Sequence, residues 1–379
     1  MVGRWLEMLA IALFAYQITR SAFVVAMLTM LRLLPMALFG AFLGAAADRF
    51  DHRRALVLMV IVAMTPTLML AALATYDTGA IRVWHLAVAS FINGICWAAD
   101  NPVRRMMIGE VVGHDRMASA MSADIGTNNA SRILGPVISG LLLAAFGIAS
   151  VFWFNTALYA AGLVAALRIT AHNRPRAAHT SSFLTSIREG FAWLRNDPPL
   201  IGIFAITVIF NVFGWPFTSM IPVIGTDYLR LGPQGVGLLA SCEGVGGLVG
   251  ALVLAAVARP GRYATLYVGS VGIYFVMVIG FATAPIVPVA AVALFMAGIV
   301  ACGFAAMQAT LVYRCAPVEM RARLLGVLSV CIGMGPLGFL YLGFLADLLT
   351  PRIATVALGA QGLVALLLTR RYWRTALRL

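Results

Sequence analysis

The sequence predicts an all-α polytopic membrane protein whose twelve transmembrane helices form two pseudo-symmetric six-helix bundles. Hydrophobic residues make up 62% of the 379 residues and charged residues only 11%, and the mean hydropathy is +0.95. No water-soluble core requires such a composition. Apolar runs long enough to cross a bilayer follow one another, separated by short connections that contain arginine. The two halves also share short glycine motifs, as expected of two related bundles.

The first bundle is predicted to occupy residues 1–168. Arginine clusters follow its second and fourth apolar segments, whereas Arg82 alone follows the third. Positive charge resists translocation, so the second and fourth connections are expected in the cytoplasm. The six segments lie near 4–18, 22–47, 55–75, 83–107, 117–146 and 150–168.

Residues 169–199 are polar and are predicted to form a cytoplasmic linker. Phe183, Ile187, Phe191 and Leu194 recur in it at helical spacing, which indicates an amphipathic surface helix. The second bundle, residues 200–379, ends in a basic tail, so both termini are expected in the cytoplasm. Its segments lie near 200–228, 233–257, 263–284, 286–313, 322–348 and 351–369.

The internal repeat relates the two bundles and indicates that the first helix is shorter than its counterpart. Gly94-Ile95 recurs as Gly298-Ile299, and Gly135-Pro136 recurs as Gly335-Pro336. By the same comparison the first helix starts later than its counterpart, helix seven. Its apolar segment has about fifteen residues, whereas a span needs about 20. We therefore expect the first helix to be incomplete at its start.

The connection after the second segment combines carboxylates with arginines, in the order Gly44-Ala-Ala-Ala-Asp48-Arg49-Phe50-Asp51-His52-Arg53-Arg54. The orientation of the chain in the membrane requires only the arginines. The carboxylates are therefore expected to pair with the arginines or to cap a helix. The pattern resembles the loop between helices two and three of the major facilitator superfamily of secondary transporters. Asp51 replaces the usual glycine, and His52 adds a residue.

The variant "DRFDHRR" resembles the branch that contains the enterobactin exporter and macrolide efflux proteins. The resemblance implies a gating loop, with Asp48 meeting the start of helix eleven near residues 321–324. The residues assigned to this loop are Gly44, Asp48, Arg49, Asp51, Arg53 and Arg54.

Ionisable side chains inside spans are costly and usually face a cavity or a partner. Proton coupling needs a buried carboxylate with an arginine nearby, so that loading and release can alternate; Glu7, Asp124 and Glu243 are the candidates. A static ion pair that fixes helix register is the equally weighted alternative for each, and Asp100 is expected to be structural. Asp124, Asn128 and Arg132, spaced by four, share a helix face. The residues expected to line a cavity are Arg4, Arg32, Asp100, Asn128, Arg132, Asn211 and Trp215.

Gly135 and Pro136 stand in "RILGPVISG", which resembles the Gly-Pro motif in the fifth helix of many exporters. Ser131 and Ser139 occupy positions where that motif has glycine, which weakens the inference of export. Gly135, Pro136 and Gly140 are equally compatible with plain helix packing.

The resemblance implies a secondary transporter that exports a small drug-like, siderophore-like or lipid-like compound in exchange for protons, by alternating access. An importer or facilitator of the same fold remains open, and a polytopic membrane enzyme is a weaker alternative. The sequence has no G-x-x-x-x-G-K-[ST] loop, no lysine, no G-x-S-x-G and no H-E-x-x-H, which argues against a nucleotide-driven pump and against common hydrolases.

The expected partners are the substrate, protons and the lipid bilayer, with no cofactor or metal, because the five cysteines lack metal-ligand spacing. The net charge of +13 lies in the connections between spans, so it is orientation charge and not a nucleic-acid surface. We expect a monomer in the bacterial inner membrane.

Overall fold

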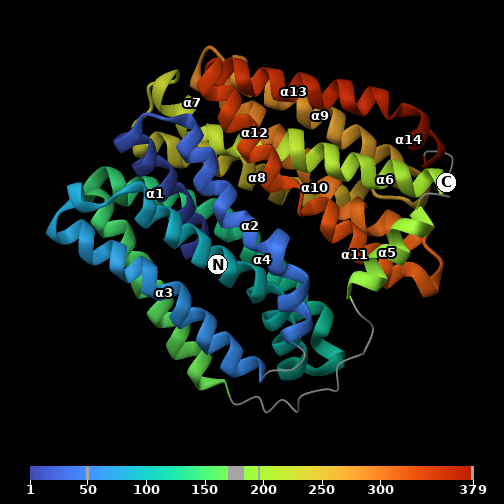
Figure 1. The fold of residues 1–379 in the computed structure, drawn as a ribbon, viewed down its shortest axis with the longest axis horizontal. Coiled ribbons are helices and arrows are strands. Elements are labelled where there is room, and N and C mark those ends of the chain that lie inside the picture. Colours follow the sequence, from blue (N-terminus) through green and yellow to red (C-terminus); the bar gives the residue numbers. More distant parts are fainter. Residues whose placement is uncertain (48–50, 170–182, 195–196, 377–379) are drawn as a thin grey trace. The chain divides into compact units, whose positions relative to one another are not determined.

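The computed structural model describes residues 1–47, 51–169, 183–194 and 197–376. All regular elements within these ranges are helices, as predicted (Figure 1). The α-helices are α1 (Val2–Thr19), α2 (Ala22–Ala47), α3 (His52–Tyr76), α4 (Val83–Arg168), α5 (Phe183–Leu194), α6 (Pro198–Ile209), α7 (Ile221–Asp227), α8 (Pro233–Val257), α9 (Tyr263–Thr283), α10 (Val287–Cys315), α11 (Arg321–Ile332), α12 (Gly335–Leu348), α13 (Pro351–Leu368) and α14 (Arg370–Ala376). The short irregular helices are η1 (Thr78–Ala80), η2 (Phe210–Gly214), η3 (Trp215–Met220), η4 (Pro260–Arg262) and η5 (Val318–Met320).

Nine helical stretches of the described chain are long and apolar enough to cross a membrane. One of them covers 50 residues, far more than the roughly 20 that a single crossing needs. The polytopic all-helical architecture expected from composition is therefore confirmed. The stretches are Ala22–Gly40, His52–Tyr76, Ser119–Arg168, Pro198–Asp227, Pro233–Val257, Tyr263–Thr283, Val287–Cys315, Arg323–Leu348 and Pro351–Leu368.

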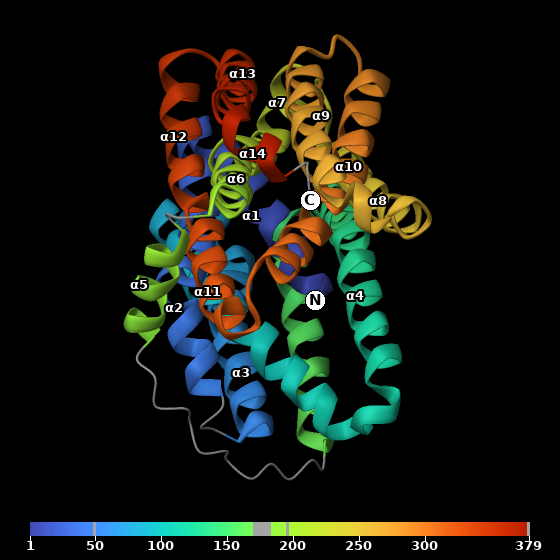
Figure 2. The same cartoon turned by 90° about the vertical axis from the view of Figure 1, so that its right-hand side faces the viewer.

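Helix α4 differs from the sequence prediction, which placed three spans separated by short loops between residues 83 and 168. The helical hydrogen-bonding pattern continues over all 86 residues. A straight helix of that length would measure about 130 Å, yet Asn93 and Asn155 both bind the carboxylate of Glu7. The chain therefore reverses direction inside α4, and Figure 2 shows it as successive columns. Gly147 supplies one bend through its positive φ of 77°.

The expected span near 200–228 is a composite of α6, η2, η3 and α7. Regular α-helix ends at Ile209, a π-helical turn follows, and a 3-10 stretch begins at Trp215. Pro216 and Pro222 lack the amide hydrogen that a regular helix needs, so the hydrogen-bond pattern changes where they occur. The expected span near 322–348 is likewise divided into α11 and α12 by a turn at Gly333 and Met334.

The chain divides into two compact units. The first unit contains residues 1–20, 28–180 and 232–238, and the second contains 21–27, 181–231 and 239–379. Each unit thus takes a short segment from the opposite half of the sequence. In the second unit this segment begins at Ser21, whose hydroxyl lies 3.5 Å from Asp347 Oδ1, and Phe23 N donates to the same oxygen.

Candidate functional site

Glu7 is the most deeply buried carboxylate of the described first unit, with no exposed side-chain area. It lies on α1 and is bound by side chains of α3 and α4. Asn93 Nδ2 donates to Glu7 Oε1 at 2.7 Å, and Asn155 Nδ2 donates to Oε2 at 2.8 Å. Thr67 Oγ1 donates to Oε2 at 3.3 Å. Neutral donors therefore satisfy this carboxylate, and the amide oxygens of Asn93 and Asn155 have no partner.

Arg32 of α2 is close enough to Glu7 to influence it electrostatically, yet forms no ion pair with it. Only 2% of Arg32 is exposed. Its Nη2 donates to the backbone oxygen of Arg4 at 3.2 Å, while Nε and Nη1 have no partner. A buried guanidinium with one neutral acceptor is poorly compensated, so Arg32 is suited to receive an anionic group.

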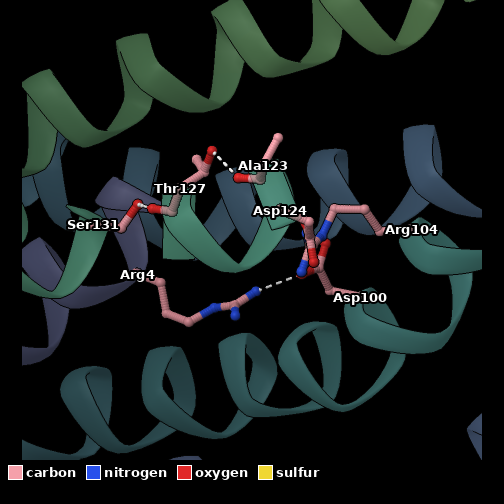
Figure 3. Close-up of polar contacts among 7 residues, drawn as sticks. All are labelled: Arg4, Asp100, Arg104, Ala123, Asp124, Thr127 and Ser131. Atoms are coloured by element: carbon pink, nitrogen blue, oxygen red, sulfur yellow. Dashed lines mark hydrogen bonds and ion pairs between the residues drawn. The ribbon is translucent and has the colours of Figure 1, made fainter. Parts of the chain in front are cut away.

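Four charged residues form a second cluster, in which Arg4 and Arg104 converge on Asp100 and Asp124 (Figure 3). Arg4 Nη2 lies 2.9 Å from Asp100 Oδ2, and Arg104 Nε lies 3.3 Å from the same oxygen. Arg104 also pairs with Asp124 Oδ1. Two guanidiniums and two carboxylates balance, so the cluster is formally neutral. The structural role expected of Asp100 stays a prediction.

The predicted face of Asp124, Asn128 and Arg132 is divided in the structure. Asp124 faces Arg104, whereas the Arg132 guanidinium lies 5.2 Å above the ring of Trp5. Asn128 is half-buried between them. The side chain of Asp124 is only 6% exposed, so Arg104 is central to its compensation.

The second unit buries a group of uncharged polar side chains. Thr207 Oγ1 and Tyr267 Oη lie 2.8 Å apart, and Gln308 Nε2 donates to Thr207 Oγ1 at 3.2 Å. Asn211, at the π-helical turn, donates to the backbone oxygen of Thr207 at 2.8 Å. Trp215 packs edge-on against Phe339 of α12, with ring centroids 5.8 Å apart. The two divided helices of this unit therefore approach each other at Asn211 and Trp215, and a Cβ atom built at Gly335 would lie 3.6 Å from Trp215 Cε3 and 3.8 Å from Asn211 O.

Glu243 of α8 is also buried, with 8% of its area exposed. A side chain at Gly298 would collide with the backbone oxygen of Glu243. The repeated Gly-Ile motif of α10 thus permits close packing of α10 on α8 at the position of this coupling candidate.

The loop between α2 and α3 is described from Asp51 onward, and Asp48 and Arg49 lie outside the described residues. Asp51 caps α3 by accepting a hydrogen bond from Arg54 N at 2.8 Å, which is one of the roles expected of the loop carboxylates. Arg53 Nη2 donates to Leu167 O at 2.6 Å, near the end of α4. Gly44 lies in the last part of α2.

Gly135 and Gly140 allow close helix packing in the first unit. A Cβ atom at Gly135 would lie 2.6 Å from Trp5 Cβ, and one at Gly140 would lie 2.5 Å from Pro233 O. Both distances are shorter than real contacts allow, so α1 and the start of α8 approach α4 at positions that only glycine permits. Pro136 lies between these two contacts, and its carbonyl faces Gly237.

A family model for transmembrane secretion effectors matches residues 1–376. The chain belongs to the major facilitator superfamily. The transporter is 27% identical over 385 residues to the multidrug efflux pump Tap of Mycolicibacterium fortuitum, covering 97% of this chain and 92% of Tap. It is 23% identical over 248 residues to macrolide efflux protein A of Streptococcus pyogenes, covering 65% and 61% of the two chains.

A crystallised POT family transporter in complex with a thioalcohol conjugated peptide has the same fold, with a TM-score of 0.75. Its sequence is 13% identical, and the match covers 99% of this transporter and 95% of that chain. At this identity the similarity concerns the fold alone. The family match and the sequence relatives, in contrast, confirm the family and the resemblance to efflux proteins.

Sequence reasoning named Asn128, Asn211 and Trp215 but missed the neutral partners of Glu7. Thr67, Asn93 and Asn155 of the transporter are the direct partners of Glu7. A search for asparagine inside apolar spans would have found two of them, because buried amides are costly in lipid for the same reason as charges. Gln308 in α10 would have been found in the same way.

Proposed function

We propose that this transporter is a proton-coupled exporter of a small drug-like, siderophore-like or lipid-like compound and works by alternating access. In this proposal twelve spans form two six-helix bundles, residues 1–168 and 200–379, joined by a cytoplasmic linker, 169–199. The protein is a monomer in the bacterial inner membrane with both termini in the cytoplasm. The family match and the efflux functions named for two relatives support export.

The environment of Glu7 is the observation that carries the coupling proposal. As a carboxylate, Glu7 accepts hydrogen bonds from Asn93, Asn155 and Thr67. As a carboxylic acid it would need an acceptor. If the side-chain amide of Asn93 or Asn155 rotated by half a turn, its oxygen, which has no partner in the structure, would accept a hydrogen bond from the protonated carboxyl group. Neutral groups can thus hydrogen-bond both protonation states without moving a helix.

Arg32 links this proton site to the charged cluster. Its Nε and Nη1 can bind one anion, either deprotonated Glu7 or an acidic group of a substrate. Arg4 lies one helical turn before Glu7, accepts the hydrogen bond from Arg32 and binds Asp100 with its side chain. A proton on Glu7 would leave Arg32 available to another anion, so an anionic substrate group would bind together with the proton. A cationic substrate group, by contrast, would compete with the proton for the Glu7 carboxylate, and this exclusion is what antiport requires.

Transport into inverted membrane vesicles tests the proposal. We expect an inside-acid gradient to drive accumulation of at least one compound from a panel of a macrolide, a siderophore and a lipid-like dye. An uncoupler should abolish this accumulation. Glu7→Gln should keep substrate counterflow and lose gradient-driven accumulation, whereas Glu189→Gln, which alters an exposed carboxylate, should keep both.

The remaining outcomes separate the alternatives. Accumulation that persists with an uncoupler contradicts proton coupling, and flux without accumulation indicates a facilitator. Accumulation only in right-side-out vesicles indicates an importer. Wild-type pH dependence in Glu7→Gln would remove Glu7 from the proposal, and the same assay on Asp124→Asn and Glu243→Gln would rank the other two carboxylates.

A further inference from the structure

A groove of about 300 Å³ lies among α8, α9 and α10 of the second unit. Its walls are almost entirely apolar, and several of them are open to the surroundings: Val257 is 37% exposed and Ile273 is 50% exposed. Gly269 opens the groove, since a Cβ atom built there would meet nothing within 4 Å. The lining includes Leu254, Val257, Leu266, Gly269, Ile273 and Ile299.

One end of this groove is basic. Arg259 and Arg262 are exposed and lie in the connection between α8 and α9, where Arg259 precedes η4 and Arg262 is its last residue. Arg259 follows the lining residue Val257 by two positions, and Arg262 precedes the lining residue Thr265 by three. Both arginines are therefore within about one helical turn of the groove.

The third helix of the groove ends with another arginine at the same place. Arg314, in the last turn of α10, lies 5.9 Å above the ring of Tyr263, the first residue of α9. The sequence contains no Asp or Glu between Glu243 and Glu319. The charged residues between these two glutamates are therefore all arginines.

We propose that the groove binds one anionic phospholipid, with an acyl chain along the apolar walls and the phosphate on Arg259 and Arg262. Arginine-rich ends of spans face the cytoplasm, and the cytoplasmic leaflet carries the anionic lipids. A soluble anion would use only the basic end, whereas a neutral lipid would use only the groove. A phospholipid with a negative headgroup uses both. The proposal does not depend on the substrate or on the direction of transport.

Two variants separate the parts of the site. Arg259→Gln/Arg262→Gln removes the headgroup contacts from exposed positions. Gly269→Leu fills the groove without a clash, because no atom lies within 4 Å of its Cβ position. Matched controls are Arg116→Gln/Arg188→Gln, an exposed pair elsewhere, and Gly162→Leu on α4, where a Cβ atom also meets nothing within 4 Å.

Native mass spectrometry of the purified transporter, titrated with phosphatidylglycerol or with phosphatidylcholine of the same chains, measures the binding. We expect one phosphatidylglycerol to bind more tightly than phosphatidylcholine. An arginine beside an anionic headgroup is worth about fivefold in affinity, so the double arginine variant should weaken phosphatidylglycerol binding about 25-fold. Gly269→Leu should abolish saturable binding of both lipids, and the two controls should bind as wild type does.

Two further arms need no variant of the transporter. Dihexanoyl phosphatidylglycerol should bind more weakly than the long-chain lipid, and glycerol 3-phosphate should not compete. The proposal would be overturned if phosphatidylglycerol and phosphatidylcholine bound equally well. It would also be overturned if Arg259→Gln/Arg262→Gln and Gly269→Leu both bound phosphatidylglycerol with wild-type affinity. Competition by glycerol 3-phosphate would also overturn it, because the site would then hold a free anion instead of a lipid.

Discussion

Glu7 and Asp124 are both buried carboxylates of the first unit, but they are compensated in different ways. Asp124 pairs with the guanidinium of Arg104, whereas Glu7 accepts hydrogen bonds from two amides and a hydroxyl. Protonation of Asp124 would break an ion pair, whereas protonation of Glu7 would require only the rotation of an amide. This difference makes Glu7 the better candidate for reversible proton binding and makes Asp124 the better candidate for holding α4 in its folded-back form.

The charged cluster predicts unequal effects of replacing Arg104 and Asp124. Arg104→Gln leaves Asp124 buried without its guanidinium, and breaking a buried pair costs roughly 3–5 kcal/mol. Because Arg104 is 19% exposed, we expect about 2–3 kcal/mol of destabilisation here, with screening by water taken into account. Asp124→Asn should cost on the order of 1 kcal/mol, because Arg104 keeps its contact with Asp100. Chemical unfolding in detergent measures both values.

The double variant Arg104→Gln/Asp124→Asn completes this cycle. It should be more stable than Arg104→Gln alone, since no carboxylate is then left without its partner. Arg105→Gln, at an exposed neighbouring position, is the control and should unfold as wild type does. Strictly additive losses in the double variant would show that the Arg104–Asp124 pair contributes nothing specific.

At the scale of helices, α5 is attached to α11 mainly by close packing. Glu189 pairs with Arg323 at 3.0 Å, but both side chains are more than 40% exposed, and such pairs contribute less than about 1 kcal/mol. Gly190, by contrast, is buried, and a Cβ atom there would lie 2.7 Å from Val327 Cγ2. The absence of a side chain at Gly190 therefore lets the linker helix rest on α11.

We accordingly predict that Gly190→Leu detaches α5 while Arg323→Gln does not. Trypsin cleavage after Arg188, normalised to the rate in the denatured chain, should become several-fold faster in Gly190→Leu. It should change less than about twofold in Arg323→Gln, because only an exposed ion pair is lost. Gly162→Leu controls for a bulky residue at a helical glycine. Equal protection of Gly190→Leu and wild type would mean that α5 tolerates the added side chain in place.

The composite helix α6–η2–η3–α7 shows what hydropathy misses at this scale. Its 30 residues read as one apolar span, yet the regular α-helix stops at Ile209. Proline positions hint at the interruption, whereas the π-helical turn also depends on packing against α12, where Gly338 lies against Val212 and Pro216. Irregular backbone within spans is a recurrent feature of transporter binding sites, and it coincides here with the predicted cavity residues Asn211 and Trp215.

At the scale of the whole molecule, the arginine distribution predicts which connections face the cytoplasm. The Thr78–Ala80 connection is followed by Arg82 alone, whereas the connection between α8 and α9 contains Arg259 and Arg262. We expect alkaline phosphatase inserted at Gly79 to be active and green fluorescent protein inserted at Gly261 to fluoresce. Both glycines belong to short connections, so insertion should spare the spans. The opposite pattern would reverse the orientation and would also move the proposed lipid site to the outer leaflet.

The sequence by itself determined that the chain is helical and membrane-embedded, because the partition of a segment into lipid depends on its own composition and length. It also showed that Glu7, Arg32, Asp100 and Asp124 lie inside or beside spans, where charge is costly. Only the tertiary structure decided their partners. Arg4 binds Asp100, and Glu7 binds residues of α3 and of two distant turns of α4. Hydropathy does not record which faces of the helices meet, since that depends on close packing at residues such as Gly135, where a single Cβ atom would prevent contact.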